Sequence, residues 1–403
     1  MNDATTKQPD KEAHFQYLLT PGPLTTDPKV REAMMDDWGS WDIDFRLLNK
    51  NICRDILAIL GPSGNGFECI PIQGSGSFAV EAMLGTFIPR DGKALILANG
   101  AYGLRAATAL EYIGRPHTLL NKGDYLPPRA DEVYSILSAD RSITHVFLVH
   151  CETSSGILNP LKEIADVTEK LSRKLLIDSM SAFGAIELNP KEIQFDALVS
   201  SANKCIEGAP GFSFAIARKD ALVASQDNCH SLSLDLHDQW LYMQKTGQWR
   251  FTPPTHVVAA FAEALKIHSE QGGVSGRFKR YNRNKKILLK GMRDLGFETL
   301  LSEPWLSPII VTFFCPNDDA FEFGMFYKLM KSKGFIIYPG KLTVADSFRI
   351  GCIGSIDSSV MASVVEAVAV SLSEMGVKDA RPSSKAIAEK EKLICGSKQA
   401  LVS

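Results

Sequence analysis

Short apolar runs alternate with helix-like segments between about residues 90 and 220, and this alternation constrains the fold more than any other feature. Each run is continuously apolar, which is typical of strands buried on both faces of a sheet. Helix-like segments lie between them, for example at 104–113 and 161–174. Strand–helix alternation predicts an α/β fold with a largely parallel sheet covered by helices. The expected strands are KALILANG (93–100), HVFLVHCE (145–152), KLLIDSM (174–180) and DALVSSANK (196–204).

The sequence changes character after a long helix-like stretch at 251–273. Three strand-like runs then surround a helix-like run at 320–333, which predicts a smaller α+β domain. The runs are SPIIVTFFC (307–315), GFIIYPG (334–340) and SFRIGCIG (347–354). The final stretch is polar, and we expect it to be loosely held or partly helical. The expected segments are an N-terminal arm (1–25), a large domain (26–274), a small C-terminal domain (275–375) and a polar tail (376–403).

The overall charge excludes several classes of partner. The chain has 44 Lys and Arg against 46 Asp and Glu, for a formal net charge of −2. This balance gives no electrostatic basis for binding nucleic acid or an anionic membrane surface. The amino end is polar and lacks the apolar core of a signal peptide, and no apolar run approaches the roughly 18 residues of a membrane helix. We therefore expect a cytoplasmic protein.

The cysteines and histidines do not predict a metal site. The eight cysteines include no C-x-x-C pair, and the eight histidines form no H-E-x-x-H motif. Cys205 lies beside a lysine and could be a nucleophile, but a small buried residue at a strand end is the favoured interpretation. His150 follows an apolar run, so we expect a hydrogen-bonded core histidine there.

One lysine and one aspartate end neighbouring strands of the expected sheet. Asp178 ends the run LLID, and Lys204 follows the next run, 26 residues further along. That separation is about one strand–helix–strand step, and ligands of such sheets gather at the carboxyl ends of the strands. Burying an unpaired charge is costly, so both groups need partners. They either pair with each other or face one cofactor that has a pyridine nitrogen and an aldehyde.

Pyridoxal 5′-phosphate has these groups. It needs a lysine for its aldehyde, an acid for its ring nitrogen, a cradle for its phosphate and a surface for its ring. The cradle candidate is GSGSFAVEAM (74–83), where small and hydroxyl residues precede a helix pattern, because helix amino termini bind phosphate. The ring candidate is Tyr102, which also follows a strand, as does the hydroxyl of Thr153. Taken singly, the cradle is also explained as a capped helix and Tyr102 as a core residue.

The order of these features resembles the class V aminotransferases, which are fold type I enzymes dependent on pyridoxal phosphate. The resemblance runs from about residue 16 to 375. Finer motifs are similar to the branch of this family that acts on 2-aminoethylphosphonate and pyruvate. These motifs are YLLTPGPLTT (17–26), WGSWDIDF (38–45), HCETSSGILNP (150–160), SSANKCIEGAPGFSF (200–214), RFTPPTH (250–256) and GKLTVADSFRIGCIG (340–354).

The resemblance implies roles for individual residues. Lys204 would hold the cofactor and move the substrate proton, and Asp178 would pair with the pyridine nitrogen. The other cofactor contacts would come from Ser75, Gly76, Ser77, Tyr102 and Thr153. The family usually has Thr at the position of Ser77, a change that keeps the hydroxyl.

Two further roles are implied by the resemblance. Thr252 is similar to a residue that reaches the phosphate of a neighbouring subunit, which implies a homodimer. Arg349 matches the arginine that receives the acid group of the substrate. A structural ion pair of this arginine with Asp346 is the alternative for that side chain.

The expected reaction is transfer of the amino group of 2-aminoethylphosphonate to pyruvate, giving phosphonoacetaldehyde and L-alanine. The nearest alternative is an alanine–glyoxylate or serine–pyruvate aminotransferase with the same fold. A cysteine desulfurase-like lyase would need a cysteine on a mobile loop, whereas Cys315 and Cys352 lie in strand-like runs. A sheet domain without catalysis, in which Lys204 and Asp178 are simply an ion pair, is the alternative from another class.

Overall fold

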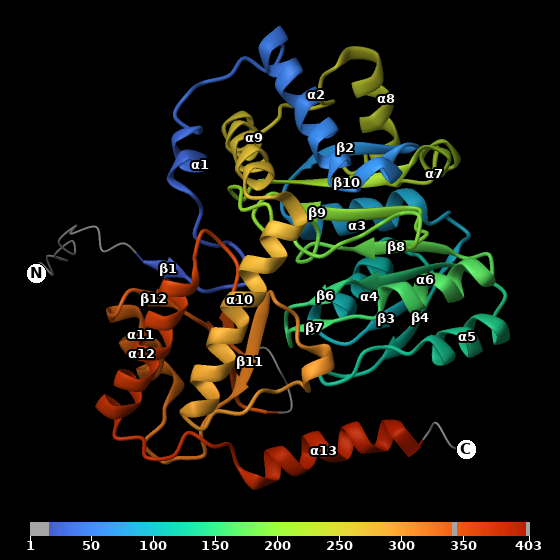
Figure 1. Ribbon diagram of the computed structural model, residues 1–403. Coiled ribbons are helices and arrows are strands. Elements are labelled where there is room, and N and C mark those ends of the chain that lie inside the picture. The colour runs from blue at the N-terminus through green and yellow to red at the C-terminus, as the bar shows by residue number, and fades with distance from the viewer. Residues whose placement is uncertain (1–15, 341–344, 400–403) are drawn as a thin grey trace, which may run out of the picture.

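The computed structural model describes residues 16–340 and 345–399, and Figure 1 shows a central sheet covered by helices with a second, smaller sheet beside it. The central sheet has seven strands in the order β2-β10-β9-β8-β5-β3-β4. All neighbours from β4 to β9 are parallel, while β10 runs antiparallel to both β9 and β2. The strands are β2 (Phe67–Gln73), β3 (Lys93–Ala98), β4 (His117–Asn121), β5 (Ile143–Val149), β8 (Lys174–Asp178), β9 (Ala197–Ser201) and β10 (Phe212–Arg218).

Helices cover both faces of this sheet, which is why its strands read as continuous apolar runs. Successive residues of β3 illustrate the arrangement: Leu95 and Leu97 pack in one apolar cluster, and Ala94 and Ile96 pack in another. The first face is covered by α2 (Ile43–Ala58), α5 (Ala130–Ala139), α6 (Leu161–Lys170) and α9 (Thr255–Glu270). The second face is covered by α3 (Gly76–Phe87), α4 (Ala101–Tyr112), α7 (Lys219–Ala224) and α8 (Leu236–Thr246).

The C-terminal part has its own sheet, in the order β11-β14-β13. Aromatic rings fill its core, where Phe348 lies 5.6 Å from Phe297 and 5.3 Å from Phe326, measured between ring centroids. Asp357 starts the last core helix, because its carboxylate accepts hydrogen bonds from the backbone N–H groups of Ser359 and Val360. The elements are β11 (Ile310–Phe314), α11 (Phe323–Ser332), β12 (Phe335–Ile336), β13 (Tyr338–Pro339), β14 (Ser347–Gly351) and α12 (Ser358–Met375).

Two segments join the two parts of the molecule. Helix α10 (Gly273–Asp294) runs from the central sheet to the C-terminal part and packs against both α9 and α12 (Figure 1). The chain near the N-terminus runs beside the smaller sheet, where β1 (Tyr17–Leu18) pairs with β12. The remaining short elements are α1 (Pro28–Glu32), β6 (Cys151–Glu152), β7 (Ile157–Leu158) and two 3-10 turns, Gly61–Gly64 and Glu303–Trp305.

The expected strands and the α/β class are confirmed, with one difference: the antiparallel direction of β10 was not expected. The tail is partly helical, which was one of its two expected states; its helix, α13 (Ser384–Gln399), extends beneath both parts in Figure 1. The expected boundary at residue 275 falls within two residues of the start of α10, and the domain boundaries stay predictions. Most of the expected N-terminal arm, residues 1–15, and the tail end 400–403 lie outside the described residues.

One helix among the described residues meets a membrane helix's requirements of length and composition, which the sequence interpretation did not anticipate. This helix is α12, with a mean hydropathy of 1.3 over 18 residues. Its Met361, Val364, Val368 and Leu372 pack into the core of the C-terminal part. The apolar character of α12 is therefore that of a helix packed on one face against α10 and α11.

Candidate active site

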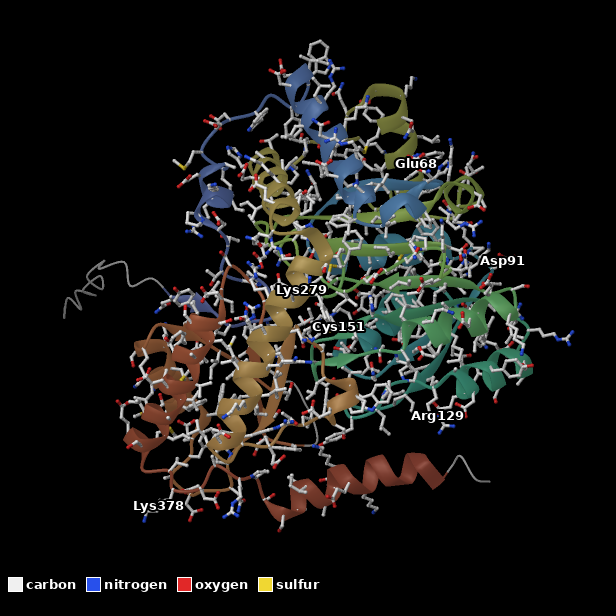
Figure 2. The ribbon with its side chains drawn as sticks, viewed as in Figure 1. Glu68, Asp91, Arg129, Cys151, Lys279 and Lys378 are labelled. Atoms are coloured by element: carbon white, nitrogen blue, oxygen red, sulfur yellow. The ribbon has the colours of Figure 1, made fainter. Side chains whose placement is uncertain are left out.

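A cavity of about 270 Å³ lies at the carboxyl ends of β5, β8 and β9. It is bounded on the other side by the amino end of α3 and one face of α4. Because parallel strands end at the same edge, the sheet brings together residues from distant parts of the chain. The predicted site residues that line it are Ser75, Gly76, Ser77, Tyr102, Asp178 and Lys204. Cys151, labelled in Figure 2, also lines this cavity.

Lys204 reaches the cavity from the turn that follows β9. Its Nζ donates to the carbonyl oxygens of Pro21 and Gly22 at 3.1 and 3.5 Å. Gly22 has a φ of +118°, and a Cβ there would lie 2.7 Å from Lys204 Cδ. Only glycine fits both conditions without strain. The segment near the N-terminus therefore forms part of the wall around the lysine amine.

Asp178 ends β8. Its side chain is buried and lines the same cavity as Lys204. Its Oδ1 accepts a hydrogen bond of 2.9 Å from the backbone N–H of Met180. Burial raises the pKa of the Asp178 carboxyl to about 6, and the nearby Glu152 carboxylate contributes to the rise, while Lys204 opposes it. Burial removes water from the Asp178 carboxylate and so makes its negative charge unfavourable. A cation next to the carboxylate would offset this cost.

The amino end of α3 forms the opposite wall. Ser75 precedes the helix, and its side chain makes no capping hydrogen bond, so its hydroxyl is available to a ligand. The first backbone N–H groups of a helix have no partner within it and bind anions well. A Cβ on Gly76 would lie 2.5 Å from Met180 Cε, so a larger residue here would have to displace the end of the Met180 side chain. Ser77 Oγ accepts a hydrogen bond of 3.1 Å from Arg105 Nη1.

Sequence reasoning missed Glu152, which organises the wall that carries Tyr102. The side chain is fully buried, and its Oε2 accepts from the backbone N–H groups of Tyr102 and Gly103 at 3.0 and 3.3 Å. Its Oε1 accepts from the N–H and Oγ of Ser154 at 3.1 and 2.6 Å. A Cβ on Gly100 would overlap both side chains. Burial raises the pKa of Glu152, and these hydrogen bonds oppose that rise.

Three predicted site residues do not line the cavity. Thr153 is buried beside it, and its side chain hydrogen-bonds that of Tyr102. Burial is the largest influence on Tyr102 and raises the pKa of its hydroxyl. Thr252 is exposed in the loop between α8 and α9. Its neighbour Phe251 lines a second cavity, which also contacts Gly74.

Arg349 is fully buried on β14. Its Nε and Nη2 donate to the carbonyl oxygen of Pro339 at 3.1 and 3.0 Å, and Nη1 donates to that of Thr153 at 2.7 Å. The guanidinium carbon lies 5.2 Å from the centroid of the Tyr338 ring. Burial lowers the pKa of the Arg349 guanidinium. In the described part of the chain Arg349 makes no ion pair with Asp346, so the structural ion pair that was the alternative is not formed.

The other candidate side chains behave as structural residues. Cys205 is buried and its Sγ donates to the carbonyl oxygen of Ser181, and burial raises the pKa of its thiol. His150 is buried against the Ser179 hydroxyl at 3.1 Å, with its pKa lowered to about 4 by burial. Burial raises the pKa of Cys315 and of Cys352 to about 12. None of these thiols has the thiolate character of a nucleophile.

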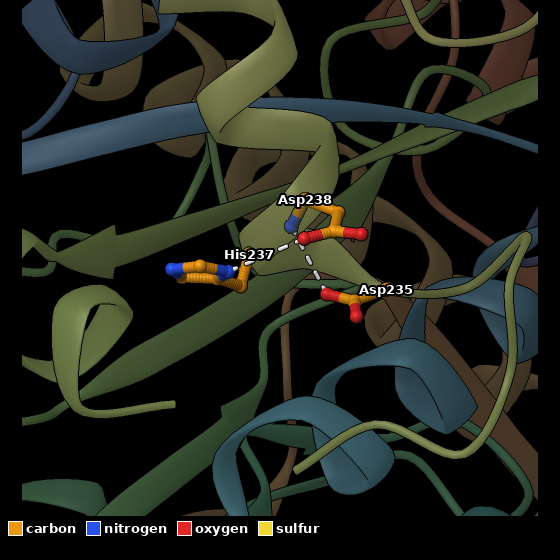
Figure 3. Close-up of side chains that lie close together, drawn as sticks. All are labelled: Asp235, His237 and Asp238. Carbon is orange, nitrogen blue, oxygen red and sulfur yellow. Dashed lines mark hydrogen bonds and ion pairs between the residues drawn. The ribbon is translucent and has the colours of Figure 1, made fainter. Parts of the chain in front are cut away.

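Asp235, His237 and Asp238 cluster at the start of α8 (Figure 3). The hydrogen bonds of this cluster are those of a helix cap. Asp235 Oδ1 accepts from the backbone N–H of Asp238 at 3.0 Å, which is the usual N-cap arrangement. Asp238 also lies 3.6 Å from Arg250 Nη2, a cation that offsets its charge. Helix capping and this ion pair account for the cluster.

Comparison with known proteins identifies the family. Residues 118–328 match the family model described as aminotransferase class-V. The chain is 62% identical to 2-aminoethylphosphonate–pyruvate transaminase of Rhizobium meliloti, over 94% of this chain and 98% of that protein. It is 60% identical to 2-aminoethylphosphonate–pyruvate transaminase 1 of Paraburkholderia xenovorans, over 94% and 97%. The Pseudomonas aeruginosa protein of the same name is 52% identical over 89% and 97%.

Solved structures of other aminotransferases share the fold. Ureidoglycine–glyoxylate aminotransferase of Bacillus subtilis superposes with a TM-score of 0.82 at 19% identity, covering 94% of this chain and 98% of that one. Pyridoxamine–pyruvate aminotransferase of Mesorhizobium loti gives 0.81 at 20% identity, covering 96% and 99%. At these identities the structures establish the fold alone. Together with the family match and the relatives above 50% identity, they lead to one conclusion: this chain belongs to the class V aminotransferase family.

Proposed function

We propose that this chain transfers the amino group of 2-aminoethylphosphonate to pyruvate, with pyridoxal phosphate as its cofactor, giving phosphonoacetaldehyde and L-alanine. The observation that carries the proposal is the joint position of Lys204 and Asp178 in one cavity, facing a helix amino end. The substrate class is supported by relatives of that name, which are 62% and 60% identical over nearly the whole chain. The proposed role belongs to phosphonate metabolism.

The cavity fits the cofactor by the chemistry of its walls. Lys204 offers an amine, Asp178 a buried acid, and Ser75, Gly76 and Ser77 an anion-binding helix end. The absence of a side chain at Gly76 keeps this end open. Ser201 Oγ also lines the cavity and has no hydrogen-bond partner among the described residues. An unsatisfied buried hydroxyl of this kind favours a polar ligand.

Two side chains, Asp178 and Lys204, would do the chemistry, and two more would hold the ring. When bound, pyridoxal phosphate withdraws electrons from the carbon that carries the amino group. Asp178 would keep a proton on the ring nitrogen, since its buried carboxylate favours a cation beside it. Lys204 would accept a proton from the carbon next to the substrate amine, acting as the general base. Tyr102 and its partner Thr153 would bound the ring face and edge.

Arg349 would receive the acid group of each substrate. A guanidinium binds phosphonate and carboxylate alike through paired hydrogen bonds. Its donors now bond the carbonyl oxygens of Pro339 and Thr153, which carry no formal charge. A substrate anion would exchange for one of these carbonyls and match the buried cation better. The same arginine would therefore serve both the aminophosphonate and pyruvate.

A homodimer in the cytoplasm completes the proposal, with Thr252 reaching the phosphate of the partner subunit. Support comes from the exposure of Thr252 and from large apolar side chains exposed near its loop. Phe251 is 45% exposed, and Phe78, close to the phosphate cradle, is 53% exposed. An exposed apolar cluster of this kind marks an interaction surface.

Steady-state kinetics with pairs of substrates test the substrate class. The purified enzyme should form alanine from 2-aminoethylphosphonate and pyruvate with a kcat/KM far above that for alanine with glyoxylate or serine with pyruvate. A higher kcat/KM for alanine with glyoxylate, or for serine with pyruvate, would assign the chain to the alternative branch instead.

A further inference from the structure

The charge of the cofactor phosphate needs a partner in this cavity. Among the described residues that line the cavity, two carry a formal positive charge, Lys204 and Arg105. In the proposed function the Lys204 amine is bonded to the cofactor aldehyde, so it is not free to pair with the phosphate. The helix amino end supplies the equivalent of about half a positive charge, which a phosphate dianion exceeds several-fold. Among the described lining residues, Arg105 is therefore the cation that remains available to the phosphate.

The geometry of Arg105 directs it toward the cradle. It lies on α4, three residues after Tyr102, so both side chains share one helix face. Its Nη1 donates to Ser77 Oγ at 3.1 Å, and its guanidinium carbon lies 5.0 Å from the centroid of the Tyr102 ring. The aromatic ring and the serine together hold the guanidinium at the rim of the helix end.

Among the described residues Arg105 hydrogen-bonds Ser77 and forms no ion pair. The Glu81 carboxylate also lines the cavity, one turn after Ser77 on α3, but is not paired with Arg105. The planar guanidinium has donors to spare after the bond to Ser77, and its fork matches two oxygens of a phosphate. Nothing in the class V resemblance assigned a role to this residue.

We propose that Arg105 binds the phosphate of pyridoxal phosphate, with its guanidinium held by Ser77 and Tyr102. This inference rests on the proposed cofactor but not on the proposed substrate. It makes Arg105 the main charge partner of the phosphate, while Ser75, Gly76 and Ser77 supply hydrogen bonds. Tyr102 then has two functions, since it bounds the ring and supports the arginine.

Cofactor binding to the apoprotein tests the proposal without any substrate. Binding of pyridoxal phosphate and of pyridoxal, which lacks the phosphate, is followed by visible absorbance. Arg105→Gln should weaken pyridoxal phosphate binding about 10- to 100-fold, the range for one charge-assisted hydrogen-bonded pair. It should change pyridoxal binding less than about twofold. Arg105→Lys keeps the charge without the fork and should fall between wild type and Arg105→Gln.

The control is Arg293→Gln, which removes an exposed arginine on α10 that pairs with Glu303. It should leave both Kd values unchanged. Equal weakening of pyridoxal and pyridoxal phosphate by Arg105→Gln, or no weakening of either, would overturn the proposal. If Arg105→Gln does not fold, an Arg105→Lys protein with wild-type affinity for both ligands would overturn it too. A wild-type protein that binds neither ligand would overturn the cofactor assignment itself.

Discussion

Glu152 joins the start of α4 to the loop that carries Thr153 and Ser154. One carboxylate oxygen accepts the backbone N–H of Tyr102 at 3.0 Å, and the other accepts the Oγ–H of Ser154 at 2.6 Å. Thr153 lies between Glu152 and Ser154 and hydrogen-bonds the Tyr102 side chain. Glu152 therefore positions Tyr102 and Thr153, which are proposed to contact the cofactor, without needing to touch the cofactor itself.

Glu152→Gln should lower stability and weaken cofactor binding together. The amide would turn an N–H₂ group toward backbone or hydroxyl donors and leave at least one of them unsatisfied, at a cost of about 1–3 kcal/mol. Urea unfolding measures the stability, and absorbance titration measures the Kd for pyridoxal phosphate.

Asp357→Asn is the matched control for Glu152→Gln. It weakens another carboxylate cap, at the start of α12, away from the cavity. The control should lose stability, by about 1 kcal/mol or less, with an unchanged Kd. A Glu152→Gln protein with normal cofactor affinity would show that Glu152 does not position Tyr102 for the cofactor.

Lys204→Ala should lose the visible absorbance of lysine-bound cofactor and reduce turnover about 1,000-fold or more, since both the attachment and the base are removed. Stopped assays of alanine formation check the rate. Lys162→Ala, which breaks only an exposed ion pair with Asp166, should retain both properties. Substantial activity in Lys204→Ala would remove this lysine from the chemistry.

Arg349→Lys and Arg349→Ala should raise the KM for both 2-aminoethylphosphonate and pyruvate, because one cation is proposed to serve both acid groups. We expect the alanine variant to raise each KM about 10- to 100-fold, in keeping with loss of a charge-assisted pair. Initial rates over a grid of both substrates give the two values. A change in one KM alone would contradict the shared role.

The apoprotein should lose stability as the pH rises through the titration of Asp178. Burial raises the pKa of Asp178 to about 6 from its ordinary value of 3.8, so between these pH values the folded state binds more protons than the unfolded state. Stability then falls with increasing pH. Between pH 5 and pH 7 the loss from this group is about 1 kcal/mol. Urea unfolding of wild-type and Asp178→Asn apoprotein at both pH values should show this extra loss in wild type only; equal changes would contradict it.

Mixed dimers test the proposed position of Thr252. Thr252→Ala should weaken cofactor binding about tenfold, because it removes a hydroxyl that is proposed to bond the cofactor phosphate in the partner subunit. Subunits of Lys204→Ala and Thr252→Ala, unfolded together and refolded, should form hybrids in which one site has both native residues. Activity measured at limiting cofactor should exceed that of either parent. The absence of such recovery, with hybrids demonstrated by native mass spectrometry, would place Thr252 outside the neighbouring site.

The sequence predicted the residues whose positions depend on local pattern. Asp178 and Lys204 follow continuous apolar runs, and such runs become parallel strands that end at one edge. Glu152 was not predicted, because its burial depends on N–H groups about 50 residues away, at Tyr102 and Gly103. The available signal was an acid soon after the apolar run HVFLV (145–149), where a buried strand was expected to end.

Other features needed the folded chain. The sequence places Arg349 in a strand but does not reveal its hydrogen-bond partners. These are the carbonyl oxygens of Pro339 and of Thr153, which lies 196 residues earlier. The contact of Lys204 with Pro21 and Gly22 likewise joins segments more than 180 residues apart. The antiparallel direction of β10 follows from the short connection after Lys204, which returns the chain along β9 without a crossover helix.

The most direct test of the account is the visible spectrum of the purified enzyme, before and after adding 2-aminoethylphosphonate without any keto acid. We expect the yellow band of lysine-bound cofactor to disappear and to return when pyruvate is added. A yellow protein that ignores the phosphonate but bleaches with alanine or serine would contradict the assigned substrate while keeping the fold and the cofactor.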